Sequence, residues 1–589
     1  MSWQAWFTLA LVAVAVYVLA RDRLPPAPVI LGATVTLLIV GIISPEQAFA
    51  GFSNPAPITV GALFVVARAV EVTGALEAVV GRLMGKSEKG PLQLARIVGP
   101  TAFASAFLNN TPLVAMSAPE VAEWADRRGL PASRYLIPLS YAAILGGVIT
   151  VLGTSTNLVV SGLLVEAGFE PIALFEITKV GLPLAAAGCL VIVALAGRLL
   201  PDRQGAREGF DQSVREFTVA MRVLEGGPLD GSSLEEGGLR ALQHVYCVQI
   251  DRGSQVIAPV APTEVLRGGD ELTFVGKVDT VVDLQRQRGL TSSEVHHAER
   301  LGGADRAFFE CVVGDQSSLV GRTLKEVEFR ATYQAAVLAI HRAGHRIDAK
   351  LGDVRLRTGD TLLLLADRGF RSRYRESGDF LLIAGLGQAP APPSRKAPLV
   401  GAIVFGVVVL AGVGLVPILE AALGAAILLV AVGALSLTEA RRSVDIDVLI
   451  VIAAAFGLSA AVTESGLADA LAGSLLAVFA PFGAIGALVG VLLATMALTE
   501  VLTNNAAAVL LFPIAMSTAA AVGADPRPFA IMVLLGASLS FLTPIGYQTN
   551  LMVYGLGGYR FGDYARLGLP LNLVVFTLAL LLVPQLWPL

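Results

Sequence analysis

Runs of about 20 mostly apolar residues, long enough to cross the hydrocarbon core of a bilayer as a helix, recur along this 589-residue chain. Five runs precede residue 201 and five follow residue 396. They cover residues 3–20, 27–44, 56–73, 135–165, 178–200, 397–416, 418–437, 446–463, 529–556 and 567–588. Inside a bilayer the backbone must satisfy its own polar groups, so these runs predict helices. We therefore expect a polytopic α-helical membrane protein with two membrane blocks, residues 1–202 and 396–589.

Charged residues are concentrated between the two blocks. Residues 201–400 hold 53 of the 90 Lys, Arg, Asp and Glu residues and all five histidines, which predicts a soluble insert. The net charge of −4 argues against a nucleic-acid partner. The three cysteines, Cys189, Cys247 and Cys311, are too scattered for a disulfide framework or a zinc site.

The two membrane blocks repeat each other. Phe107-Leu-Asn-Asn-Thr-Pro resembles Val501-Leu-Thr-Asn-Asn-Ala at a separation of 394 residues, and Gly153-Thr-Ser-Thr-Asn-Leu resembles Gly546-Tyr-Gln-Thr-Asn-Leu at 393. The apolar stretches 93–118 and 484–516, which contain the paired asparagines, are interrupted by polar residues and are predicted to be re-entrant hairpins. Each block thus has five spans and one hairpin. Because five is odd, the two repeats are expected to be inverted, as in many secondary transporters.

Basic residues indicate the orientation. Pairs such as Arg198 and Arg203, or Arg441 and Arg442, follow odd-numbered spans, whereas loops such as 415–420 contain no Lys or Arg. The positive-inside rule then places the insert in the cytoplasm and both termini outside the plasma (inner) membrane.

The insert itself shows a duplication. Arg267-Gly-Gly-Asp270 and Arg357-Thr-Gly-Asp360 lie 90 residues apart, and each precedes an apolar alternation typical of a turn followed by a strand. We expect two small α+β domains over residues 210–290 and 303–385. A purely structural role for them is the simplest interpretation.

Polar clusters at the interruptions are the candidate binding residues. Polar side chains inside apolar membrane segments are costly unless they line a cavity or find partners. Breaks in such segments expose helix N-termini, which favour anions, and free oxygens, which favour small cations. The alternative is that Asn and Thr only hold helices together, but paired clusters favour a binding site. Glu71, Glu464 and Glu500 are the acids within the membrane blocks that could couple protons; pairing or snorkelling is the simpler interpretation for Glu71 and Glu464.

Four of these motifs, in this order, resemble the signatures of the divalent anion:sodium symporters (the DASS family, similar to solute carrier family 13). The motifs are Leu108-Asn-Asn-Thr-Pro, Gly153-Thr-Ser-Thr-Asn-Leu, Thr499-Glu-Val-Leu-Thr-Asn-Asn-Ala and Thr543-Pro with Thr549-Asn-Leu. The insert resembles a tandem pair of TrkA-C (RCK-C) domains, and the variant of the family with such domains looks more like its sulfate branch.

The resemblance implies an elevator-type symporter, usually a homodimer, that carries sulfate, or alternatively di- or tricarboxylates, together with Na⁺. It implies one sodium near Ser105, Asn109, Asn110 and Gly153, and a second near Thr499, Leu502, Asn504 and Leu542. The implied substrate contacts are Asn109, Asn110, Thr111, Ser155, Thr503, Asn504, Asn505, Thr543 and Pro544. Asn109 and Asn505 replace the Ser and Thr of the family pattern, so the preferred anion could differ.

Two other functions fit parts of the sequence. An aspartate–alanine-type exchanger has a similar layout of membrane halves around TrkA-C domains, although it gives no reason for the paired hairpins. A ligand-gated channel could use the insert as its sensor, but the inverted repeat argues against it. The sequence supports no enzymatic activity. The ligand of the insert, a nucleotide or another small molecule, is not indicated.

Overall fold

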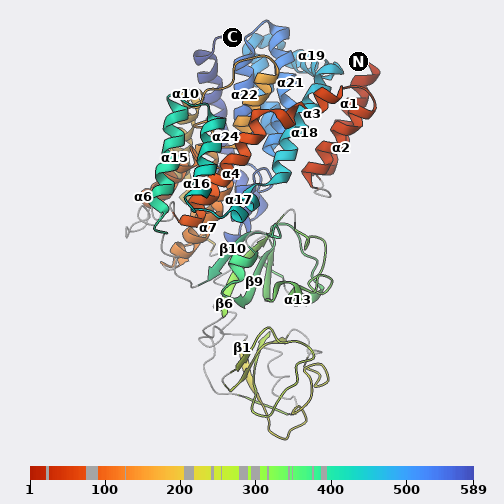
Figure 1. Ribbon diagram of the computed structural model, residues 1–589, viewed down its shortest axis with the longest axis vertical. Helices are drawn as coiled ribbons and strands as arrows, with labels where there is room; N and C mark the ends of the chain where they lie inside the picture. Colours follow the sequence, from red (N-terminus) through yellow and green to blue (C-terminus); the bar gives the residue numbers. More distant parts are fainter. Residues whose placement is uncertain are drawn as a thin grey trace.

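Figure 1 shows the computed structural model as a body of packed helices with two smaller β-sheet units at one end. The structure describes residues 1–589 except 21–24, 75–90, 127, 204–217, 240–244, 254, 277–288, 293–305, 315–316, 343–344, 348, 350, 375–376 and 387–393. Both chain ends lie at the end of the helical body that is remote from the sheets. The structure thus separates the apolar blocks from the charged insert, as the composition predicts.

The first membrane block forms nine described helices. They are α1 (Trp3–Ala20), α2 (Pro26–Ile39), α3 (Pro45–Ser53), α4 (Pro55–Thr73), α6 (Pro91–Ser105), α7 (Asn110–Asp126), α8 (Ser133–Gly147), α9 (Ser155–Glu166) and α10 (Thr178–Leu199). The predicted spans 56–73 and 178–200 correspond to α4 and α10. The predicted span 135–165 is two helices, because the chain leaves helical geometry between Gly147 and Ser155.

The second block repeats this order. Its helices are α15 (Ala397–Gly412), α16 (Ile418–Ala431), α17 (Leu437–Ser443), α18 (Ile446–Glu464), α19 (Leu467–Phe479), α20 (Gly483–Thr499), α21 (Asn504–Val522), α22 (Pro526–Ser538), α23 (Gln548–Leu556) and α24 (Phe561–Leu586). The predicted span 529–556 is likewise broken, into α22 and α23. The expected hairpins 93–118 and 484–516 correspond to α6–α7 and α20–α21, each interrupted at its asparagines.

The polar clusters at 154–157 and 543–550 predict a break in two of the ten spans, and the structure has both breaks. Within the described part of the chain, five helices are long and apolar enough to cross a membrane, or six if the bent pair α19–α20 forms one span. Several remaining helices are apolar but shorter, including α2, α15, α16 and α22. The number of long helices is smaller than ten because spans 135–165 and 529–556 are divided at these breaks and several other spans form helices shorter than 18 residues.

Packing follows the same scheme in both blocks. Helix α2 packs against α18, and its counterpart α16 packs against α4; α6 packs against α8, and α20 against α22. A matching Gly-Leu-Pro motif in each block, at Gly181 in α10 and at Gly568 in α24, allows these two helices to pack closely as well. A Cβ atom at Gly181 of α10 would collide with the carbonyl of Val148, and one at Gly568 of α24 with the carbonyl of Phe541. Only glycine lets these helices reach the breaks beside them.

The insert contains two five-stranded antiparallel sheets of the same design. The first sheet has the order β3-β2-β4-β1-β5. The second sheet, written in the same direction, has the order β8-β7-β9-β6-β10, so equivalent strands of the two sheets occupy the same places. The strands of the first are β1 (Thr218–Val223), β2 (Val245–Arg252), β3 (Gln255–Ile257), β4 (Glu271–Gly276) and β5 (Leu290–Ser292). Those of the second are β6 (Arg306–Val313), β7 (Ala336–Arg342), β8 (His345–Arg346), β9 (Thr361–Asp367) and β10 (Phe380–Leu386).

The repeated Gly-Asp turns anchor these sheets. The guanidinium of Arg252 donates two hydrogen bonds to Asp270, at 2.9 and 2.7 Å, and Arg342 donates two to Asp360, at 2.8 and 2.7 Å. Both aspartates are buried. The aspartates of the two duplicated motifs are therefore structural ion-pair partners, which satisfies their buried charges.

The second sheet rests directly on the helical body. Val312 of β6 and Leu382 of β10 belong to the same buried apolar cluster as the membrane helices. Gly359 lies against Leu551 and Tyr554 of α23, and a Cβ atom at Gly555 would collide with Thr361 Oγ1. The contact therefore depends on close approach of β9 to α23. Figure 1 shows the first sheet farther from the helices.

Replacing Gly555 by Val should weaken the packing of the second sheet against α23, because the new side chain needs the space that Thr361 occupies. We expect faster proteolytic cleavage within the insert of the purified protein and a lower apparent melting temperature. Gly562→Val is the matched control, because a Cβ atom there meets nothing within 4 Å. Equal cleavage rates in the two variants would show that this contact does not hold the sheet.

Candidate functional site

The N-termini of four helices, α7, α9, α21 and α23, meet in the helical body. Thr156 at the start of α9 donates a hydrogen bond to Asn505 Oδ1 of α21 (3.0 Å), and the Ser155 hydroxyl lies 3.3 Å from the same amide. On the opposite side, Thr111 of α7 donates to Gln548 Oε1 of α23 (3.2 Å). Each helix start carries unpaired backbone N–H groups and the positive end of its dipole. Their convergence creates an environment suited to an anion.

A cluster of oxygens lies beside the start of α7. Ser105 Oγ donates to the Ala143 carbonyl (2.8 Å) and lies 2.5 Å from one atom of the Asn110 amide. The same amide atom is 3.1 Å from the Ala143 carbonyl oxygen and 3.2 Å from the Gly153 carbonyl oxygen. A Cβ atom at Gly147 would come within 2.8 Å of the amide, so glycine is needed for this approach. Ser105, Asn110 and Gly153, predicted to share a sodium site, are thus brought together.

The second block builds the same cluster beside α21. Thr499 Oγ1 lies 2.8 Å from the Ala537 carbonyl oxygen and 3.1 Å from Asn504 Oδ1, and its one hydrogen can be donated to either. These residues lie 394 positions after Ser105, Ala143 and Asn110. Gly546, rather than Leu542, stands where the first block has Gly153. Leu502 is buried at the turn before α21.

Both broken spans are held open by a buried asparagine. Asn157 Nδ2 donates to the carbonyls of Gly147 and Thr150, each at 2.9 Å. Asn550 Nδ2 donates to the carbonyls of Ser540 and Thr543, each at 3.2 Å. These amides satisfy carbonyl groups that the break removes from the helix, which the apolar surroundings would otherwise leave unpaired.

The two clusters differ most at Glu500, a charged residue whose equivalent in the first block is an alanine. Its Oε1 accepts hydrogen bonds from the backbone N–H groups of Phe541 and Leu542, and its Oε2 accepts one from Thr543, all at 3.0 Å. The corresponding residue of the first block is Ala106. Glu500 therefore supports the break between α22 and α23, a role that the sequence did not indicate.

The other two acids have ordinary partners. Arg68 forms a 2.9 Å ion pair with Glu71, as their spacing on one helix predicts. Glu464 accepts a hydrogen bond from Gln47 Nε2 (2.9 Å). Pairing, the simpler interpretation of these two residues, is confirmed.

Two side chains that the sequence did not single out complete the site. Tyr547, just before α23, places its hydroxyl 2.6 Å from the Asn110 amide and 3.3 Å from Thr154 Oγ1. Ser140 of α8 donates to Asn550 Oδ1 (2.7 Å) or Thr549 Oγ1 (2.9 Å). A signal for Tyr547 existed: it occupies the position that Thr154 holds in the first repeat motif.

The remaining predicted substrate residues lie around this convergence. Asn109 and Ser155 line a cleft whose other wall is the apolar face of α4, including Val60, Leu63 and Phe64. Thr503 is solvent-exposed at the turn before α21 and Pro544 is buried in the break before α23. Thr543 Oγ1 donates to the Glu500 carbonyl (3.3 Å) and accepts from the Gly546 N–H (2.9 Å).

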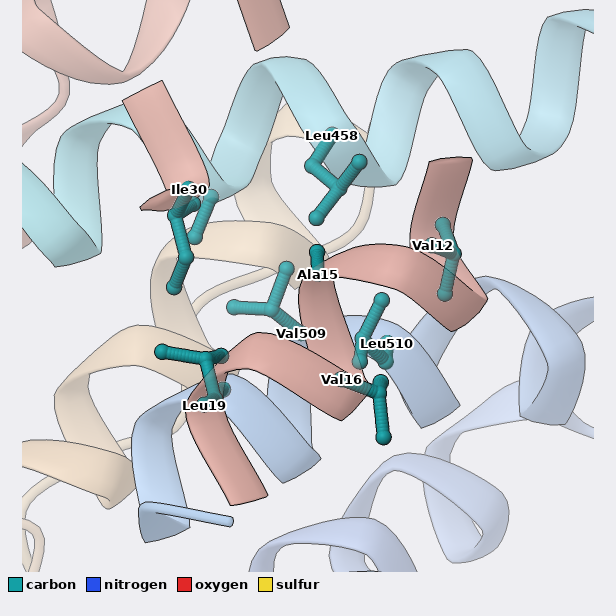
Figure 2. Close-up of a pocket in the computed structure, with 10 residues that line it drawn as sticks. Val12, Ala15, Val16, Leu19, Ile30, Leu458, Val509 and Leu510 are labelled. Carbon is teal, nitrogen blue, oxygen red and sulfur yellow. The ribbon is translucent and has the colours of Figure 1, made fainter. Parts of the chain in front are cut away.

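A second hollow lies between α1, α2, α18 and α21, where Figure 2 shows only aliphatic side chains pointing inward. Val12, Ile30, Leu458 and Val509 are among them. Without a polar group this hollow cannot orient an anion. The polar convergence, which carries no Lys, Arg or His among its named contacts, is the candidate site.

Comparison with known proteins supports a transport function for this chain. The family model described as citrate transporter (CitMHS) matches residues 14–536. A Chlamydomonas reinhardtii protein named for a role in the sulfur deprivation response is 36% identical over 94% of this chain and 96% of its own length. An uncharacterized transporter of Synechocystis is 34% identical over 98% of this chain and 96% of its own. Sodium/sulfate cotransporter 1 of C. reinhardtii is 26% identical over 98% of this chain and 89% of its own.

Replacing Glu500 by Gln should destabilise the break between α22 and α23. The amide NH₂ of Gln would face a backbone N–H, and charge-assisted hydrogen bonds would be lost, at a cost of roughly 2–3 kcal/mol. A fall in the apparent melting temperature of the purified protein is the measurement. Glu464→Gln is the control, since that exposed carboxylate has an exposed partner, and its change should stay below about 0.5 kcal/mol. Similar melting temperatures for both variants would contradict the assigned role.

Proposed function

Because this chain belongs to the citrate transporter family, we propose that it is a sodium-coupled importer of a small divalent anion, with sulfate as the substrate. The observation that carries the proposal is the pair of matching oxygen clusters that flank four converging helix N-termini. The clusters are suited to cations and the N-termini to an anion. Both kinds of ligand can therefore be bound next to each other.

Charge balance favours a divalent anion. The named contacts of the site include no Lys, Arg or His, so a bound anion must be neutralised by helix dipoles and by co-transported cations. Two clusters provide for two sodium ions, whose charge of +2 equals that of sulfate in magnitude. A fully ionised tricarboxylate would leave an unbalanced negative charge in apolar surroundings, which is costly.

The Asn110 amide supports cation binding at the first cluster. If its oxygen faces the cluster, oxygens of Ser105, Asn110, Ala143 and Gly153 converge with a single hydroxyl hydrogen among them. Oxygen ligands in a confined space are what a hard cation such as sodium requires. If the nitrogen faces the cluster instead, it donates hydrogen bonds to these oxygens. When sodium is absent, the amide nitrogen would donate hydrogen bonds to the cluster oxygens, and a bound sodium ion would interact with these oxygens in its place.

We further propose that the two membrane blocks are inverted repeats with re-entrant hairpins. Residues that lie 393 or 394 positions apart make equivalent hydrogen bonds within their own blocks, and this equivalence supports the arrangement. The predicted elevator mechanism, homodimer, cytoplasmic insert and plasma-membrane location belong to the same proposal. The two insert domains are proposed to be TrkA-C-like regulatory units, and the common strand order of their sheets agrees with a duplication.

A di- or tricarboxylate is the second candidate substrate, because the matched family model carries the description citrate transporter. Carboxylates and sulfate present similar oxygens to hydroxyl and N–H donors. The names of two of the relatives refer to sulfur or sulfate, and together with the charge balance this favours sulfate.

Uptake into proteoliposomes tests the proposal. We expect radiolabelled sulfate to accumulate when sodium is outside and not when potassium replaces it, with weaker competition by citrate or succinate.

Ser105→Ala should raise the half-saturating sodium concentration about 5- to 10-fold, since a ligand hydroxyl worth about 1 kcal/mol is removed. Thr101→Ala is the control on the same helix, because Thr101 Oγ1 donates only to Ile97 of its own helix (2.7 Å). Uptake of none of these anions with sodium would refute the proposal.

A further inference from the structure

We propose that Tyr547 couples the first sodium site to the anion site by reversing the direction of its hydrogen bond with Asn110. This inference rests on the proposed function and adds the step by which one ligand promotes binding of the other. It uses three features: the position of the tyrosine hydroxyl, the neighbours of the Asn110 amide, which suit its oxygen or its nitrogen on either side, and the asymmetry between the two blocks.

The Tyr547 hydroxyl lies at the centre of the convergence. It is 2.6 Å from the side-chain amide of Asn110 and 3.3 Å from Thr154 Oγ1, and the Asn504 side chain lies near it. Asn110 and Asn504 are the equivalent asparagines of the two oxygen clusters. The residue is only 8% exposed and its ring packs in the apolar core. The hydroxyl is thus held in place between the two cation sites.

Only one polarity of the Asn110 hydrogen bond is compatible with a cation. A cation in the cluster requires the amide oxygen to face Ser105 and Gly153, and the amide nitrogen then donates to the Tyr547 oxygen. In the other orientation the nitrogen faces the cluster, and the amide oxygen accepts the Tyr547 hydroxyl hydrogen. A hydroxyl group has one hydrogen to donate. With sodium bound this hydrogen is released for another acceptor, and without sodium Asn110 occupies it.

The released hydrogen is placed where an anion would accept it. The hydroxyl lies 3.3 Å from Thr154 Oγ1, which precedes α9, and near Asn504 at the start of α21, and both helix starts offer N–H groups to an anion. A hydrogen bond from the phenol to a buried anion is charge-assisted and therefore strong. Sodium binding thereby converts Tyr547 from a donor to Asn110 into a donor available to the substrate.

This device exists in one block only. Thr154 precedes α9 as Tyr547 precedes α23, with nearly identical backbone angles of φ −145°, ψ 148° and φ −144°, ψ 137°. The shared backbone shows that the difference lies in the side chain alone. The shorter Thr154 side chain cannot cross to the opposite cluster, whereas the tyrosine ring of the second block reaches Asn110 of the first.

Tyr547→Phe tests the inference, because it removes the hydroxyl and keeps the ring. Binding of radiolabelled sulfate to purified protein is measured over a range of sodium concentrations, with choline replacing sodium at constant ionic strength. Sodium binding alone is followed by the rise in melting temperature without sulfate. We expect the sodium-induced gain in sulfate affinity to fall about 5- to 10-fold, while sodium alone stabilises the variant at least as well as the original protein. A merely structural defect would weaken both.

Tyr554→Phe is the matched control, because that tyrosine lies two helical turns farther along α23 and outside the convergence. It should keep the original coupling. If the original protein and Tyr547→Phe show the same sodium-dependent gain, the inference is overturned while the proposed function stands. If the original protein binds no sulfate in sodium, the proposed function itself fails.

Asn110→Asp gives a second, independent variant in case Tyr547→Phe does not fold. A carboxylate presents oxygen to the cluster and to Tyr547 at once, so the phenol hydrogen stays occupied. We expect stronger stabilisation by sodium alone together with weaker sulfate binding. Stronger sulfate binding by this variant would overturn the inference.

Discussion

The whole helical body depends on one constraint: a backbone that leaves helical geometry inside an apolar environment must still find hydrogen-bond partners. Each broken span meets this constraint with one buried asparagine, Asn157 or Asn550, which bonds two freed carbonyls. Glu500 does the same for three freed N–H groups. The candidate site lies where these stabilised breaks bring the starts of α7, α9, α21 and α23 together.

The two blocks solve this problem with the same contacts but not with the same residues. Ser105 and Thr499 make equivalent hydrogen bonds, whereas Glu500 and Tyr547 replace Ala106 and Thr154. An approximately symmetric scaffold explains why two cation-suited clusters occur. The asymmetric replacements place a negative charge and a long polar side chain on one side only. A single anion bound between the clusters would therefore meet two different surfaces.

Much of this arrangement could be predicted from residues with a clear local signature. The paired asparagines, the Gly-Leu-Pro motifs and the Gly-Asp turns all mark positions where the structure shows matching contacts. The carbonyls of Ala143 and Ala537 could not be predicted, because a backbone oxygen carries no sequence signal. The contact between Tyr547 and Asn110 joins residues more than 400 positions apart, and no periodicity indicates it. The breaks in spans 135–165 and 529–556 could be predicted from their polar clusters, whereas the short lengths of α2, α15 and α16 could not, because the residues that follow these helices are equally apolar.

The packing of the second sheet against α23 has a thermodynamic consequence. Helix α23 carries Gln548 and Thr549 at the site and, one to two turns later, Leu551 and Gly555 against the turn that leads into β9. The two ends of this short helix therefore share one rigid element. If a molecule that binds the insert changes the affinity for the anion through this contact, then the anion must change the affinity for that molecule by the same factor. Such reciprocity requires no long pathway, because the connecting helix is only nine residues long.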